Sequence, residues 1–176
     1  MDTNIFMREA RNVQPDLPPP HLLQWIVYKA VSSEELEDQN APFRLSVLEA
    51  LHETLTPADR ILVRFILEQE IIYHEQFAGM SDSLRLCGFL LSLLARLDDV
   101  RLLWEAKITN FDTMCGFDIQ LLVGAGVSAT LAYLQHIQED WAQEAKEYIE
   151  ECQQAGDFDR LDQYRATMQR YFRNTV

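Results

Sequence analysis

The most hydrophobic stretch of the chain runs from Ser81 to Leu97, and it predicts a buried helix. Residues 86–95 include no charged side chain, and apolar residues fall on every side of a 3.6-residue helix, so no face is suited to water. The stretch is shorter than the roughly 20 apolar residues that span a bilayer. We therefore expect it to form the central helix of a helical domain, with amphipathic helices packed around it.

The segments on either side of this stretch have apolar residues at intervals of three or four, which is typical of helices with one buried face. All six prolines lie at or before Pro57, so no proline interrupts a helix after that point. The glycines Gly79 and Gly156 are expected to follow helix ends. The pattern predicts helices over residues 21–31, 42–55, 57–78, 98–107, 117–123, 128–138 and 141–155, and a last helix begun by Asp157.

Together these segments predict one all-α domain of about eight helices over residues 17–176. A chain of 176 residues is long enough to bury a substantial core in a single domain. The helices are expected to form either an irregular bundle or a short curved array of helix hairpins. Residues 1–16 have no clear period and are expected to form a flexible N-terminal arm. Between Asn110 and Gly126 we expect a loop, a short helix and a tight Gly-Ala-Gly turn.

The formal net charge of −13 is spread over both halves of the chain. Such a surface repels nucleic-acid phosphates and anionic membranes and attracts basic proteins, although acidity can also serve solubility alone. The three cysteines are odd in number and far apart, and the chain begins with no secretory signal pattern. We therefore expect a cytoplasmic protein that binds neither nucleic acid nor membrane.

Two short motifs suggest catalysis but lack the context that catalysis requires. Gly124-Ala-Gly126-Val-Ser-Ala129 matches the turn of a dinucleotide-binding fold. That fold needs a second strand ended by an acid about 20 residues later, whereas a polar, helix-forming stretch follows here. Cys115 lies in the irregular block and could be an exposed nucleophile, but no residue is identified as its base. We expect a close helix–helix turn and a small apolar side chain instead, with no bound cofactor.

Two histidines follow glutamates at spacings that place both side chains on one helix face. Glu49 and His52 match the Glu-x-x-His pair of helical di-metal sites, and Glu70 and His74 are one residue further apart. Such sites use the pair twice, whereas only one pair has the required spacing. A metal-dependent helical-bundle enzyme using these four residues is therefore kept as an alternative, while the preferred interpretation has neither metal nor catalytic residues.

Two acidic clusters are the candidate partner-binding residues. They comprise Glu34, Glu35, Glu37 and Asp38 in a connector, and Glu144, Glu147, Glu150 and Glu151 on the helix over residues 141–155. A solvated outer face explains such clusters in many proteins. A binding surface for a basic protein is the functional alternative, and it would raise the association rate more than the affinity.

One block of the sequence resembles a segment carried by small bacterial proteins. Its residues are Trp104-Glu-Ala-Lys107, Phe111-Asp-Thr113, Asp118-x-Gln-Leu-Leu-x-Gly-Ala-Gly126 and Thr130-x-x-Tyr-Leu134. In overall type the chain is similar to the acidic helical immunity proteins that bacteria make against toxins. The resemblance, over about residues 98–160, implies stoichiometric binding and blockade of a toxin without chemistry by the immunity protein, and it assigns no binding residue.

The sequence therefore predicts a cytoplasmic protein-binding protein, an immunity or antitoxin-like inhibitor that neutralises a basic toxin or other basic partner by stoichiometric binding. The metal-dependent enzyme remains one alternative. A structural adaptor module, with a homodimer as a possible form, is another.

Overall fold

A computed structural model describes residues 1–11, 18–31 and 37–174 of the chain, and this part of the chain is all-α. It forms ten α-helices, joined in three places by a short 3₁₀ turn, and it has no β-strand within these ranges. An isolated antiparallel bridge joins Ala30 and Asp38. The predicted fold class is confirmed, although the number of helices exceeds the predicted eight.

The helices follow one another with short connections. They are α1 (Thr3–Arg11), α2 (Pro20–Ile26), α3 (Ala41–Thr54), α4 (Arg60–His74), α5 (Asp82–Leu94), α6 (Val100–Ile108), α7 (Phe111–Gly116), α8 (Val127–Gln135), α9 (Asp140–Ala155) and α10 (Leu161–Asn174). The 3₁₀ turns are η1 (Pro57–Asp59), η2 (Leu97–Asp99) and η3 (Ile119–Leu121). Within the described residues, no helix combines the length and the apolar character needed to cross a membrane.

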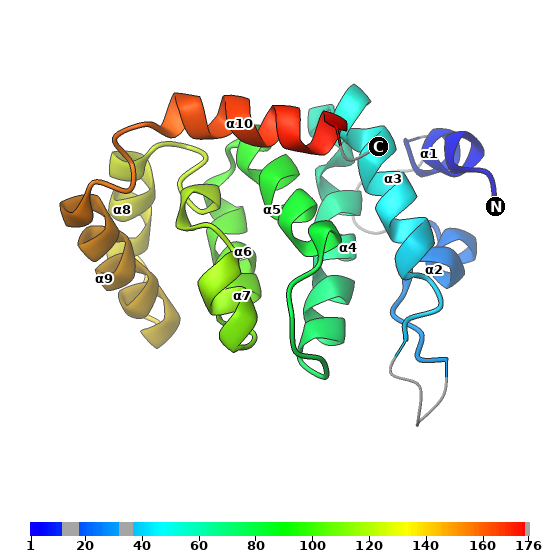
Figure 1. The fold of residues 1–176 in the computed structure, drawn as a ribbon, viewed down its shortest axis with the longest axis horizontal. Coiled ribbons are helices and arrows are strands. Elements are labelled where there is room, and N and C mark those ends of the chain that lie inside the picture. The colour runs from blue at the N-terminus through cyan, green and yellow to red at the C-terminus, as the bar shows by residue number, and fades with distance from the viewer. Residues whose placement is uncertain (12–17, 32–36, 175–176) are drawn as a thin grey trace.

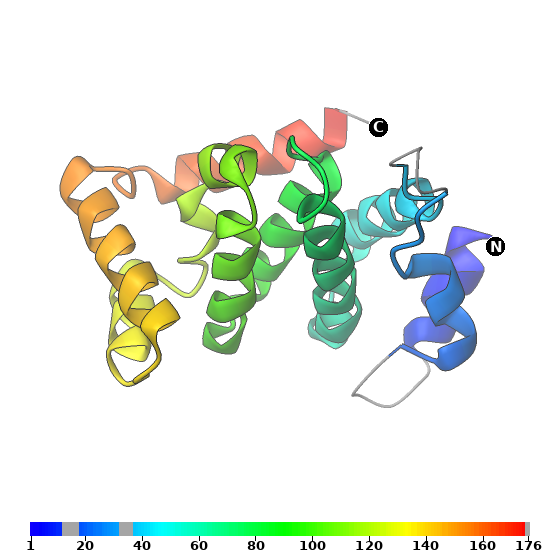
Figure 2. The ribbon, with the colours of Figure 1, turned by 90° about the horizontal axis from the view of Figure 1, so that it is seen from below.

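The helices form a two-layered array rather than an irregular bundle (Figures 1 and 2). The front layer of Figure 1 contains α3, α5, α7 and α9, and the rear layer contains α4, α6 and α8. Contacts join α3 to α5 and α4 to α6 within the layers, and α4 to α5, α6 to α7 and α8 to α9 between them. The last helix, α10, crosses the upper side of this array. The structure thus selects the helix-hairpin array from the two predicted arrangements.

The predicted central helix corresponds to α5, which lies in the middle of the array. The Ser81 hydroxyl accepts a hydrogen bond from the Leu84 amide and caps its start, and Ala95 ends it with a φ of 54°. Most of its side chains are buried, but Leu93 is 41% exposed. A Cβ added at Gly88 would lie 2.4 Å from the Phe117 ring and 3.0 Å from Leu121 Cδ1, so the absence of a side chain at this position lets Phe117 and η3 pack directly on α5.

The N-terminal segment differs from the flexible arm predicted for residues 1–16, because Thr3–Arg11 forms the helix α1. Phe6 and Met7 are buried, and the Phe6 ring lies 5.3 Å from the Phe43 ring in an edge-to-face contact. Arg11 Nε donates a hydrogen bond of 2.7 Å to Asp59 Oδ1. Residues 12–16 lie outside the described residues.

Three helix boundaries differ from prediction, and at two of them distant residues supply hydrogen bonds at the helix end. The first predicted helix, over 21–31, ends at Ile26, where the Asn40 amide donates to the carbonyl groups of Gln24 and Val27. The helix predicted to reach residue 78 ends at His74, whose carbonyl accepts from Asn110 Nδ2. The last helix begins at residue 161 rather than directly after Asp157.

The block from Asn110 to Gly126 is also more regular at its start than predicted. Its expected loop contains α7, and its expected short helix over residues 117–123 is the 3₁₀ turn η3. Gly126 has a φ of 101°, as expected for a tight turn. The block therefore forms a packed corner between α6 and α8.

Candidate protein-docking surface

The start of α7 is fixed by hydrogen bonds from two directions. Asn110 Oδ1 accepts from the Thr113 amide at 2.8 Å, and Thr113 Oγ1 accepts from the Asn110 amide at 2.9 Å, which forms a reciprocal helix cap. Asn110 Nδ2 also donates to the carbonyl groups of His74 and Phe77. Asp112 Oδ2 accepts from the Gly79 amide at 2.6 Å. The start of α7 is thus attached to the segment that follows α4.

The end of α7 is held by a buried lysine. Lys107, only 3% exposed, donates hydrogen bonds from Nζ to the carbonyl oxygens of Met114 at 2.7 Å and Phe117 at 2.9 Å. Its ammonium lies 5.2 Å from the centre of the Tyr148 ring on α9. Burial lowers the pKa of the Lys107 amine, because the charged form loses hydration. Lys107 therefore connects α6, α7 and α9.

An aromatic side chain projects from this fixed corner. Phe111, the first residue of α7, is 81% exposed, and Ile108, the last residue of α6, is 43% exposed. Cys115 is also exposed and lies one helical turn after Phe111. Side chains at this spacing share a helix face. The corner thus presents apolar groups to solvent on a backbone whose hydrogen bonds fix its position.

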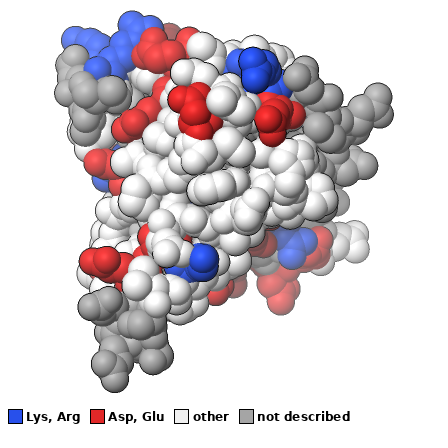
Figure 3. Space-filling model, turned by 90° about the vertical axis from the view of Figure 1, so that its right-hand side faces the viewer, with Lys and Arg blue, Asp and Glu red and all other residues white. Residues whose placement is uncertain are grey.

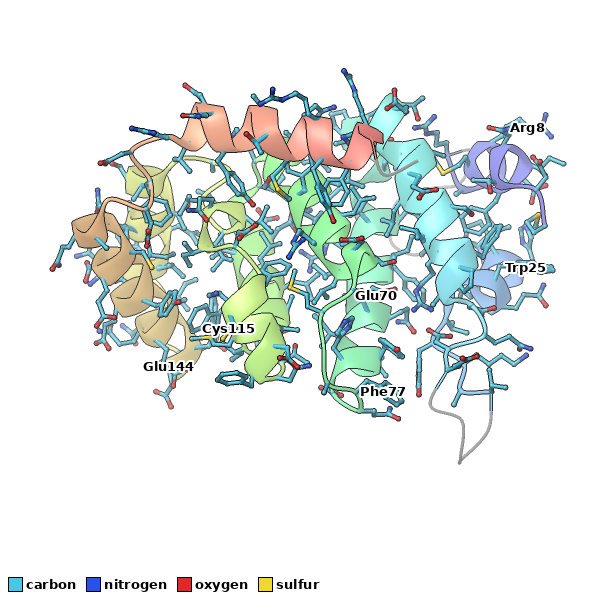
Figure 4. The ribbon with its side chains drawn as sticks, in the orientation of Figure 1. Arg8, Trp25, Glu70, Phe77, Cys115 and Glu144 are labelled. Carbon is cyan, nitrogen blue, oxygen red and sulfur yellow. The ribbon has the colours of Figure 1, made fainter. Side chains whose placement is uncertain are left out.

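The neighbouring helix α9 supplies carboxylates beside these apolar groups. Glu144, Glu147 and Glu151 are exposed, whereas Glu150 is half-buried and lies 3.3 Å from Lys146. Glu144 lies four residues before Tyr148 and Glu151 lies three residues after it, so both side chains flank Tyr148 on the helix surface. Figure 4 shows Cys115 and Glu144 on the same lower side of the molecule, on neighbouring helices. We call Ile108, Phe111, Cys115, Glu144, Tyr148 and Glu151 the α7–α9 surface.

The first predicted acidic cluster is arranged differently. Glu34 and Glu35 lie outside the described residues, and Glu37 is exposed. Asp38 is 6% exposed, and its Oδ2 lies 2.5 Å from Arg44 Nη2. Its other oxygen accepts from the amides of Lys29 and Asn40. Asp38 therefore faces the interior and is unsuited to direct partner contact.

Asp38 belongs to a buried ionic network that joins three parts of the fold. Arg44 on α3 is fully buried, and its Nε donates to Glu70 Oε1 on α4 at 2.8 Å. Glu70 Oε2 accepts from the Ser81 hydroxyl at 3.1 Å. The network thus joins the residue 38 segment to α3, α4 and the start of α5.

The histidine–glutamate pairs do not form a metal site. Glu70 is bound to Arg44, and both nitrogens of the His74 ring are occupied: Nδ1 donates to the Glu70 carbonyl at 2.7 Å and Nε2 accepts from the Ser81 amide at 3.0 Å. The His52 ring packs against the rings of Phe89 and Phe172, which also contact each other. In the described ranges no group of three or more His, Cys, Asp or Glu residues is placed to hold a metal ion.

The glycine motif serves helix packing. Residues 119–121, which would have to be a strand in a dinucleotide-binding fold, form a 3₁₀ turn. A Cβ added at Gly124 would lie 2.3 Å from the Ser92 carbonyl oxygen. Gly124 is therefore required where the backbone approaches α5, and the predicted close turn is observed.

The end of the array formed by α1 and α2 has a different character from α9. Figure 3 shows its charged side chains mainly along the upper and lower edges, with a wide uncharged area between them. Since a basic partner is attracted by exposed carboxylates, α9 suits such a partner better than this end of the array.

Comparison of the chain with protein-family models, curated proteins and solved structures found no match.

Sequence reasoning identified the acidic residues of α9 but assigned no binding or positioning role to Phe111, Ile108 and Lys107. The spacing of Asn110 and Thr113 is the signal that could have located α7, because both residue types favour reciprocal capping at a helix start. No sequence pattern separates an exposed Phe from a buried one in so short a helix. The packing of α6, α7 and α9 decides the exposure.

Proposed function

We propose that the chain is a protein-binding protein that uses the α7–α9 surface to bind a basic partner stoichiometrically. The observation that carries this proposal is the exposed Phe111 ring on a corner fixed by Asn110, Asp112 and Lys107. Exposed aromatic groups held in position are frequent energetic centres of protein interfaces. Because the corner is held by hydrogen bonds, little ordering is required on binding, which favours affinity.

The carboxylates on α9 indicate the chemistry of the partner. Glu144 and Glu151 have no ion pair with any described residue, and the whole chain carries a net charge of −13. A partner surface with an apolar pocket bordered by lysines or arginines complements this arrangement. An inhibitor of a basic toxin, of the immunity type suggested by the sequence resemblance, is the function we infer.

To test the proposal, the tagged protein is used to capture its partner from the native cytosol at low and at high salt. Titration calorimetry with the purified partner then measures the affinity and the stoichiometry. We expect one stoichiometric partner that is released by salt. Replacing Phe111 by Ser should weaken the complex by about thirtyfold or more, since an interface centre contributes about 2 kcal/mol or more.

The matched control replaces Ile5 by Ser, because Ile5 is an apolar residue that is 41% exposed on α1, far from α7 (Figure 1). It should leave the affinity unchanged. Equal affinities for the wild-type protein and the Phe111→Ser variant would contradict the proposed surface. A complex that is equally stable at low and at high salt would contradict the proposal that the partner is basic.

A further inference from the structure

Three aromatic side chains form a row between the end of α4 and the segment that follows α2. The Tyr28 ring lies 6.2 Å from the Tyr73 ring, and the Tyr73 ring lies 4.6 Å from the Phe77 ring. The Tyr28 hydroxyl donates a hydrogen bond of 3.2 Å to Gln76 Oε1, which joins the two segments. All three aromatic residues are half-buried and retain some exposed surface. We call Tyr28, Tyr73 and Phe77 the aromatic row.

Carboxylates lie around the middle ring of this row. Burial raises the pKa of the Tyr73 hydroxyl. The negative charges of Glu70, Asp38 and Glu37 raise it further. Glu37 is exposed, and its backbone carbonyl accepts from the Val31 amide at 2.9 Å. Its carboxylate makes no ion pair or hydrogen bond with any described residue, so it is available to a ligand at the row.

The buried ionic network behind the row has one more carboxylate than it has cations. Asp38 and Glu70 share the single guanidinium of Arg44. The imidazole of His74 does not balance the second carboxylate, because its Nε2 accepts a hydrogen bond from a backbone amide and therefore carries no proton. Buried charges are normally paired. The excess negative charge is thus a second indication, independent of the rings, that a cation binds here.

The aromatic row lies next to the α7–α9 surface. The Asn110 side chain donates to the Phe77 carbonyl at 3.0 Å, and Phe111 is the next residue along the chain. Figure 4 shows Phe77 and Cys115 on the same lower side of the molecule. One partner can therefore contact the aromatic row and the α7–α9 surface together.

We propose that the aromatic row binds an arginine side chain of the basic partner, an inference that rests on the proposed function. A guanidinium is flat and stacks on aromatic rings, whose faces attract a cation. The exposed carboxylate of Glu37 accepts hydrogen bonds from its N–H groups, and such bonds between charged groups are stronger than neutral ones. The excess charge of the buried network adds attraction from below.

The first test uses the free protein in an NMR titration at low salt with Nα-acetyl-arginine N-methylamide. We expect saturable shifts at millimolar concentrations, concentrated at the aromatic row and Glu37. Tyr73→Leu should weaken this binding by about fivefold, which corresponds to about 1 kcal/mol for a contact between a cation and an aromatic ring. The matched control is Tyr133→Leu, because Tyr133 is also half-buried but lies on α8, far from the row (Figure 1). It should bind the probe as the wild-type protein does.

A second pair of variants tests the carboxylate without altering the rings. Glu37→Gln should weaken binding of the probe several-fold. Glu75→Gln is its control, because Glu75 is exposed at the end of α4 and lies two residues from Tyr73, a spacing at which side chains do not face each other. Equal weakening in both variants would overturn the proposal, because it would show only general attraction by the acidic chain.

The titration of the free protein needs no partner, so its outcome is separate from that of the proposed function. Absence of saturable shifts at the aromatic row would overturn this inference and leave the α7–α9 surface unaffected. Tighter binding of Nα-acetyl-lysine N-methylamide or of tetramethylammonium would contradict the assignment to arginine. With the captured partner, Phe111→Ser and Tyr73→Leu should both weaken the complex. Weakening by Phe111→Ser alone would show that the partner does not use the row.

Discussion

At the residue scale, the fold depends on positions where a side chain or its absence allows helices to approach. Gly88 and Gly124 lie on the two sides of one contact, where η3 and the turn after it pack on α5. Arg44, fully buried, carries a charge into the interior with two carboxylates as partners. Substitutions at both kinds of position should destabilise the protein. The surrounding structure cannot easily relax around an added side chain at a close contact or around an unpaired buried charge.

Replacing Gly88 by Ala should destabilise the protein, although Ala is the better helix former. The added Cβ would lie 2.4 Å from the Phe117 ring, and overpacking of a core typically costs about 1–3 kcal/mol. Gly116→Ala is the matched control, since the nearest atom there is the flexible Met80 sulfur at 2.7 Å. Urea unfolding measures both variants. If Gly88→Ala were at least as stable as the wild-type protein, the contact between position 88 and the Phe117 ring could not be so close.

Replacing Arg44 by Met should cost about 3–5 kcal/mol of unfolding free energy, because Asp38 and Glu70 would remain buried without their cation. The triple variant Asp38→Asn, Arg44→Met, Glu70→Gln removes the charges together and should recover part of this loss. Denaturant titration compares the three proteins. A single variant as stable as the wild-type protein would mean that Arg44 does not hold the network together.

At the element scale, the helices with long apolar periods were predictable and the short ones were not. Residues 42–55 were predicted as a helix and form α3 at Ala41–Thr54, and residues 141–155 lie within α9. The period in such segments depends only on which residues face the core. By contrast, α1 depends on its contacts with Phe43 and Asp59, residues more than 30 positions away, so its short sequence could not reveal it.

The same distinction applies to the candidate surface. The exposed carboxylates of α9 were predicted from the apolar stripe of that helix, although Glu144 and Glu151 flank Tyr148 rather than lying opposite it. The burial of Asp38 was not, since it follows from Arg44, a residue that the sequence pattern alone would place in solvent. Capping by Asn110 and the position of Lys107 also depend on the packing of separate helices.

The attachment of α1 should depend on pH through Asp59. Burial alone would raise the pKa of this carboxyl, but hydrogen bonds from Arg11 and Thr56 outweigh burial and hold the pKa below its ordinary value of 3.8. Because the pKa of Asp59 is lower in the folded protein, its carboxylate stabilises the fold at pH values above the pKa of the unfolded state. This contribution is lost as the pH falls through the pKa of the folded state.

The melting temperature of Asp59→Asn should therefore be lower than that of the wild-type protein at pH 6, and the difference should shrink as the pH falls below about 4. Amide exchange of residues 3–11 should be faster in the variant at pH 6. A difference in melting temperature that stays constant down to the acid transition would contradict the role of the Asp59 charge.

At the scale of the whole molecule, the net charge of −13 and the apolar corner should contribute to binding in different ways. Exposed carboxylates mainly raise the association rate, and their effect is screened by salt. Buried aromatic contacts mainly slow dissociation.

The double variant Glu144→Gln, Glu151→Gln should consequently bind the basic partner several-fold more slowly at low salt, with a small change in the dissociation rate. The difference from the wild-type protein should vanish at high salt, where the charges are screened. Surface plasmon resonance over a salt series measures both rates, with Glu75→Gln as the control. If the double variant associated at low salt as fast as the wild-type protein, the proposal that α9 contributes to the binding surface would be wrong.

The central claim, that the α7–α9 surface contacts the partner, is tested most directly by hydrogen–deuterium exchange of the free protein and of its complex. Binding at this surface predicts new protection in residues 108–117 and 140–152, with exchange in α1 and α2 unchanged. Protection confined to other helices, with residues 108–117 exchanging as in the free protein, would contradict it.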